Sequence, residues 1–149
     1  MKRGLMLVMG VAVGGAVAMA AVAQPADPIA VRQALMKQNG KDTKAAFAMI
    51  KGDVPFDAGA ATAILASVSS AAVKFGNYFP ANSQTGGDTE AAPAIWTKPD
   101  AFKAALIKFQ TDSAAARDAK PATLDAFKAA FLPVTQNCKS CHEDFKIKK

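Results

Sequence analysis

Histidine and cysteine are scarce in this chain of 149 residues, which holds one His and two Cys. A single histidine excludes metal sites built on two or three imidazoles. Two cysteines exclude a cysteine-rich zinc scaffold and a fold held by several disulfides. Glycine and proline are also few, at 10 and 8, which excludes collagen-like chains and most disordered classes. The length fits one domain that is large enough to bury a core.

The first residues have the pattern of a secretory leader. Lys2 and Arg3 precede an apolar run from Gly4 to Ala20, and the small residues Ala21-Val22-Ala23 follow it. This order predicts a signal peptide over residues 1–23, cleaved after Ala23, and a mature domain over residues 24–149. A retained membrane anchor is the alternative, although the run is only marginally long enough to span a bilayer. Export would place the mature chain in an oxidising compartment.

The mature chain reads as four amphipathic helices. Cap residues, helical spacing of apolar side chains and terminating Gly or Pro predict helices over residues 27–50, 57–79, 99–119 and 121–145. Sustained period-two alternation is missing and β-branched residues are sparse, so strands are not expected. The short, long and short connections predict an all-α, antiparallel up-down-up-down four-helix bundle.

Two segments of this pattern need comment. Residues 80–99 form a long connection rich in Gly and Pro, which predicts an organised loop with Ile95 and Trp96 tucked against the core. The last helix has an apolar stripe with a seven-residue repeat. Pro133 interrupts this helix and should kink it locally, because proline removes one backbone hydrogen bond. That stripe consists of Leu124, Phe127, Phe131, Val134, Cys138, Cys141 and Phe145.

The last helix carries the motif Cys138-Lys139-Ser140-Cys141-His142, the C-x-x-C-H signature of covalent c-type haem attachment. Cysteines three apart on a helix project to nearly the same side, where they can reach two vinyl groups of one porphyrin. The imidazole of His142 then lies where it can bind iron. A redox-active dithiol, half of a zinc site and an inert pair are the competing interpretations. The helical context and the lack of further Cys or His favour haem.

The sequence resembles the class II cytochromes c, meaning cytochrome c′ and its low-spin relatives of the cytochrome c-556 type. The resemblance covers essentially the whole mature chain and is carried by the run Arg32 to Gly40, by Gly86-Gly87-Asp88-Thr89 leading to Ile95-Trp96, and by the C-terminal haem motif. It implies the same four-helix bundle, with one covalent haem c per chain.

The resemblance also implies roles for single residues. His142 would be the proximal iron ligand, and Met36 lies where the family places the residue that faces the other side of the iron. Arg32 and Gln33 match positions near the haem propionates. Asp88 and Thr89 match a loop that borders the haem in several members. Lys146 stands where many members carry Arg.

Function depends on Met36. If its sulfur binds iron, the haem is six-coordinate and low-spin, and His/Met ligation suits a periplasmic electron carrier. If Met36 only packs over the iron, as a methionine in a helix stripe commonly does, the five-coordinate haem would bind NO or CO. We predict the electron carrier, with the gas-binding protein as the alternative. Catalytic residue sets are lacking, so an enzyme is not expected.

Charge and composition bear on partners. Lys139, Lys146, Lys148 and Lys149 surround the haem motif; most simply they form a solvated tail, and in the functional interpretation they steer acidic redox partner proteins. The other lysines are scattered among acids, so nucleic acid is not expected as a partner. The resemblance allows a homodimer through the first two helices, where small residues permit close approach. These are Ala60, Ala61 and Ala63.

Overall fold

The computed structural model describes residues 27–148, within which all the regular elements are helices joined by turns and one isolated backbone bridge. The predicted leader, residues 1–23, therefore lies outside the described residues. The elements are α1 (Pro28–Lys51), α2 (Ala58–Phe75), η1 (Gly76–Tyr78), η2 (Ala81–Ser83), α3 (Ala94–Thr97), α4 (Pro99–Asp118) and α5 (Leu124–Phe145).

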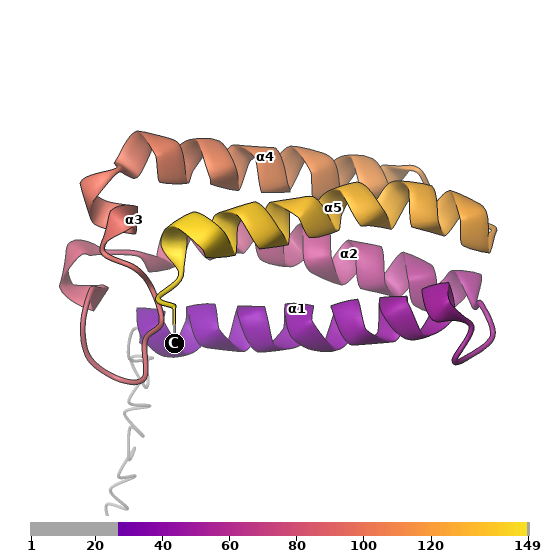
Figure 1. The fold of residues 1–149 in the computed structure, drawn as a ribbon, viewed down its shortest axis with the longest axis horizontal. Coiled ribbons are helices and arrows are strands. Elements are labelled where there is room, and N and C mark those ends of the chain that lie inside the picture. Colours follow the sequence, from indigo (N-terminus) through magenta and orange to yellow (C-terminus); the bar gives the residue numbers. More distant parts are fainter. Residues whose placement is uncertain (1–26, 149) are drawn as a thin grey trace, which may run out of the picture.

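The four long helices form the predicted antiparallel bundle (Figure 1). Consecutive long helices run in opposite directions, so the start of α1 and the end of α5 lie at the same end as the long connection. The closest packing joins α4 to α5, α2 to α4 and α1 to α2, whereas α1 and α5 approach each other at few points. This unequal packing leaves the α1–α5 side of the bundle open.

The ends of α1 follow from its cap residues. The Asp27 carboxylate accepts a hydrogen bond from the Ile29 backbone N–H at 2.9 Å, and Pro28 occupies the first turn. At the other end Gly52 adopts φ 81°, the left-handed conformation that glycine takes without steric cost. The helix continues unbroken through Asn39 and Gly40.

The second helix ends earlier than predicted. α2 stops at Phe75 and passes into the 3-10 turn η1, although its apolar period continues to Phe79. Gly76 lies against the Leu106 side chain of α4, where an added Cβ would come within 2.9 Å of Leu106 Cδ1. This close approach lets the chain turn across α4. α2 with η1 is apolar enough to cross a membrane by composition and length alone, and here its apolar face forms core.

Two apolar clusters hold the bundle together. The core cluster fills the end away from the long connection and is built from residues of α1, α2, α4 and α5. Its fully buried members include Leu65, Phe127, Phe131 and Val134. The loop cluster at the opposite end has Ile95, Phe102 and Phe145 buried at its centre, with Phe79, Trp96, Leu106 and Cys141 packed around them.

The long connection is organised, as expected, but it is not free of helix. It contains η2 and the short helix α3, which were not predicted. Ile95 is buried, and Trp96 packs near Phe79 with its indole N–H donating to the Phe79 carbonyl at 3.1 Å. The predicted tucking of these two side chains is confirmed, because they anchor the connection on the loop cluster.

The cap of α2 supplies a test of this fold. The Asp57 carboxylate accepts from the Ala60 N–H at 2.6 Å, so Asp57→Ala should lower the free energy of unfolding by about 1 kcal/mol in urea titration. Asp53→Ala is the matched control, because Asp53 is exposed on the same connection and caps no helix. Equal losses in the two variants would contradict this assignment.

Candidate functional site

A cavity of about 900 Å³ lies on the open side of the bundle, between α1 and α5 and beneath the long connection. Its volume is near the upper end of roughly 300–1,000 Å³ that small-molecule and cofactor sites occupy. Phenylalanine and leucine side chains from α4 and the loop cluster form much of its wall. All eight predicted site residues line it: Arg32, Gln33, Met36, Asp88, Thr89, Cys138, Cys141 and His142.

The motif cysteines come from successive turns of α5. Cys138 and Cys141 are both half-buried free thiols that line the cavity, and His142 follows them on the same wall. Cys141 also packs against the loop cluster. The helix therefore brings two sulfurs and one imidazole to one side of a single apolar cavity.

Burial controls the protonation of these groups. Burial raises the pKa of the Cys138 thiol, and burial with the nearby Cys138 raises the pKa of Cys141 to about 11. Reactive dithiols depend on a lowered pKa, so both cysteines are poorly suited to thiol–disulfide exchange. His142 is exposed on the wall of the cavity, and there partial burial first and Lys146 second lower its pKa, which favours the neutral imidazole.

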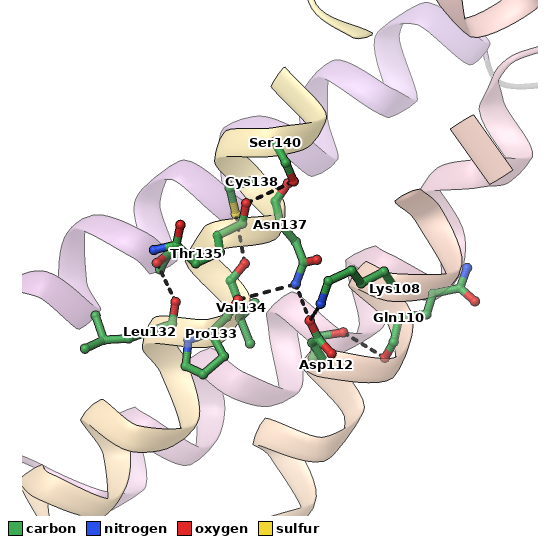
Figure 2. A network of polar contacts seen from close by, with 12 residues as sticks. Lys108, Gln110, Asp112, Leu132, Pro133, Val134, Thr135, Asn137, Cys138 and Ser140 are labelled. Atoms are coloured by element: carbon green, nitrogen blue, oxygen red, sulfur yellow. Dashed lines mark hydrogen bonds and ion pairs between the residues drawn. The ribbon is translucent and has the colours of Figure 1, made fainter. Parts of the chain in front are cut away.

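A polar network fixes the start of the motif to α4 (Figure 2). Asn137 is buried, and its Nδ2 donates to Asp112 Oδ2 at 2.7 Å and to the Pro133 carbonyl at 3.4 Å. Lys108 pairs with the same carboxylate oxygen at 2.6 Å. The hydrogen bond from Asn137, with that from Lys108, lowers the pKa of Asp112. The carboxylate stays ionised and holds α5 one residue before Cys138.

The opposite wall of the cavity belongs to α1. Met36 lines it, and Gly40 follows one turn later with open space where a Cβ would stand. Asn39 is in the same wall, and its Oδ1 is buried with no hydrogen-bond partner among the described residues. An unpaired buried acceptor costs about 1–3 kcal/mol unless a donor reaches it. Met49 is buried in the core cluster and does not line the cavity.

Arg32 ties α1 to the long connection. Its Nη1 donates to the Tyr78 carbonyl and Ser83 Oγ at 3.0 and 2.9 Å, and its Nη2 donates to the Ser83 carbonyl and Thr89 Oγ1 at 2.8 and 2.6 Å. The guanidinium also lies over the rings of Phe79 and Trp96. Burial lowers the pKa of Arg32, with nearby Asp27 opposing the shift.

Two further contacts close the mouth of the cavity. Gln33 Nε2 donates to the Asp88 carbonyl at 2.9 Å, which extends the Arg32 link along the rim. Ala91 forms an antiparallel bridge with Lys146, supported by hydrogen bonds from Ala92 and Ile147, and Lys146 Nζ lies 3.1 Å from Glu90 Oε2. The segment after α5 therefore lies beside the long connection, next to His142.

Comparison with known proteins identifies this arrangement. The family model described as Cytochrome C′ matches residues 27–146. The chain is 43% identical over 131 residues to cytochrome c′ of Rhodopseudomonas palustris, covering 87% of each chain. It is 37% identical over 118 residues to cytochrome c-556 of Agrobacterium fabrum, covering 79% of this chain and 80% of that one. The chain belongs to the cytochrome c′ family.

A solved structure agrees with this membership. Cytochrome c′ from Rhodopseudomonas palustris superposes with a TM-score of 0.78 at 39% identity, covering 84% of this chain and 99% of that chain. Proteins of the cytochrome c′ family carry covalent haem c, so haem c is the cofactor of this chain. The cavity fits that group, because it combines two thiols and a neutral imidazole on one wall with a largely apolar lining.

Sequence reasoning missed several residues of this cytochrome c′ site. Ser83 is buried and receives two of the four Arg32 hydrogen bonds, yet it stands in a polar stretch without a motif. Asn137 could have been proposed as a site residue from the sequence, because it directly precedes the first motif cysteine. Its partner Asp112 is 25 residues away in sequence, so the contact could not be predicted without the fold.

The Arg32 link can be tested apart from the cofactor. Arg32→Met removes all four hydrogen bonds and leaves buried acceptors unpaired, so the free energy of unfolding should fall by about 3 kcal/mol. Amide exchange in residues 80–92 should accelerate at the same time. Gln33→Met, which removes one exposed hydrogen bond, is the control. If both variants exchange alike, Arg32 does not hold the connection.

Proposed function

We propose that haem c is attached through Cys138 and Cys141, with His142 as the proximal iron ligand. The observation that carries this proposal is the placement of both free thiols and the imidazole on one wall of the same cavity. The raised pKa values of the thiols argue against the redox dithiol, the strongest competing interpretation. The propionate positions that the resemblance implies for Arg32 and Gln33 belong to this proposal, as do the bordering residues Asp88 and Thr89.

We further propose that Met36 supplies the sixth ligand and that the protein carries electrons. Met36 lines the cavity on α1, across from the helix that holds His142, and the other methionine of the described residues is buried elsewhere. His/Met ligation gives haem iron a raised reduction potential and leaves no open coordination position. Such a site exchanges electrons with redox partner proteins and performs no substrate chemistry, so the protein is not an enzyme.

A second candidate is a five-coordinate haem that binds NO or CO, with Met36 packed over the iron. The observation that favours it is the identity of 43% to a protein named cytochrome c′, against 37% to one named cytochrome c-556. Both candidates require the same attachment residues. They differ only in whether the Met36 sulfur is bound to iron.

The cellular location follows from the sequence of the leader. We propose cleavage after Ala23 and export to the periplasm, where haem would be attached to the mature chain. The family match begins at residue 27, close to the proposed mature start at Gln24. A homodimer through α1 and α2 remains part of this proposal, because α2 exposes Ala60 and Ala63. Ala61, the third small residue named from the sequence, is instead buried in the core cluster and does not belong to that face.

Attachment is tested by mass spectrometry after expression in a bacterium that assembles c-type haem. The peptide with Cys138 and Cys141 should carry the added mass of one haem. Either single Cys→Ala change should leave one thioether, and the double change should remove the adduct. Ser140→Ala is the matched control, since Ser140 is exposed between the two cysteines. A wild-type peptide without the haem adduct would contradict covalent attachment.

Ligation by Met36 is tested by absorption spectra of the oxidised and reduced protein, with and without CO. The wild type should be low-spin and bind CO slowly, whereas Met36→Ala should become high-spin and bind CO rapidly, because a coordination position opens. Met49→Ala is the control: it should lose about 3 kcal/mol of stability through a core cavity but keep the low-spin spectrum. A high-spin wild type that binds CO at once would favour the gas-binding candidate.

A further inference from the structure

Positive charge is concentrated on α1. This helix has five basic residues and one acidic residue, a net charge of +4. The rest of residues 27–148 has 10 basic and 11 acidic residues, a net charge of −1. The net positive charge of the described part of the chain therefore comes from one helix.

The lysines of α1 share one exposed face. Lys37, Lys41, Lys44 and Lys51 are separated by four, three and seven residues, a spacing that places them along one side of a helix. All four are exposed, and none forms an ion pair with another described residue. We call these four residues the lysine face.

The single acid of α1 does not belong to the lysine face. Asp42 is buried, and its carboxylate accepts from Gln38 Nε2 at 2.9 Å and from Ser67 Oγ of α2 at 2.7 Å. It is thus directed toward α2, away from solvent. The lysine face has no acidic side chain of its own helix to neutralise it.

The lysine face reaches the mouth of the haem cavity. Lys37 is adjacent to Met36 in sequence and lines the cavity, and Lys139 of α5 lines it from the motif side. In Figure 1, α1 forms one outer edge of the bundle, so a partner can lie along its whole length. Charge on this face acts directly beside the group that would exchange electrons.

The C-terminal lysines are less suited to this role. Lys146 is paired with Glu90 at 3.1 Å, and Glu143 and Asp144 are exposed beside the same turn. This part of the surface is therefore mixed in charge. Lys139 and Lys148 are exposed, so the basic surface that the sequence suggested around the motif stays a prediction, and α1 carries a second basic surface with more lysines on one face.

We propose that the lysine face is the docking surface for an acidic redox protein, which would then lie over the mouth of the haem cavity. This inference rests on the proposed electron-carrier function and adds the place and charge of the partner. A lipid surface fits less well, because helices that bind membranes combine lysines with apolar anchors. The large exposed apolar residues of the described chain lie outside α1: Val54, Val73, Ile107, Leu132 and Ile147.

The test uses the mature, haem-loaded protein, with poly-L-glutamate as the acidic probe and calorimetry at low ionic strength as the readout. Lys41→Glu/Lys44→Glu should weaken binding about tenfold, because opposed charges are replaced by like charges at close range. Neither residue lines the cavity, so the absorption spectrum should not change. Raised salt should abolish wild-type binding, since screening shortens the range of these interactions.

Lys98→Glu/Lys103→Glu is the matched control, with the same change of net charge at exposed positions at the start of α4. It should keep binding within about twofold of the wild type, since those positions lie away from α1. Equal weakening in both variants would mean that net charge alone acts, and would overturn the proposal. Vesicles of phosphatidylcholine and phosphatidylglycerol that bind through Lys41 and Lys44 more tightly than poly-L-glutamate would overturn it in favour of a membrane. The spin state, recorded on the same samples, tests the proposed function separately.

Discussion

The buried guanidinium of Arg32 is the interaction on which the arrangement of the site depends. A buried cation without a carboxylate partner is costly, and here four hydrogen bonds to neutral acceptors and two aromatic rings offset that cost. Because these acceptors all belong to η1 and the long connection, the cost is met only when that connection folds against α1. The link thereby places Thr89 and Asp88 at the rim of the cavity.

The two ends of the bundle differ in how completely apolar side chains fill them. The core cluster is closed and supplies most of the apolar burial, with Phe47, Phe127 and Phe131 in ring contacts across α1 and α5. The loop cluster fills less of its end and leaves the cavity open beside it. Stability from the first end thus tolerates an incompletely filled second end, which the two motif cysteines line.

Local patterns predicted most of the fold, and long-range contacts account for what they missed. Cap residues and apolar spacing gave the start of α1 at Asp27 and the long span of α5, because such signals act within a few residues. Gly76, at the end of α2, lies against Leu106, and the role of Ser83 depends on Arg32, both contacts between residues far apart in sequence. The motif predicted Cys138, Cys141 and His142 as site residues, whereas the contact of the adjacent Asn137 with Asp112 required the packing of α4 on α5.

The same packing also sets the distance between the two walls of the cavity. Because α1 and α5 touch at few points, their separation is set indirectly, by α2, α4 and the Arg32 link. Met36 and Met49 belong to one unbroken helix, so the position of Met36 at the cavity wall is tied to the packing of the core cluster, in which Met49 is buried. If the Met36 sulfur binds iron in this cavity, as proposed, a small displacement of α1 would make or break that bond. Under that proposal, ligation would depend on the position of α1, and substitutions distant from the cavity would change it.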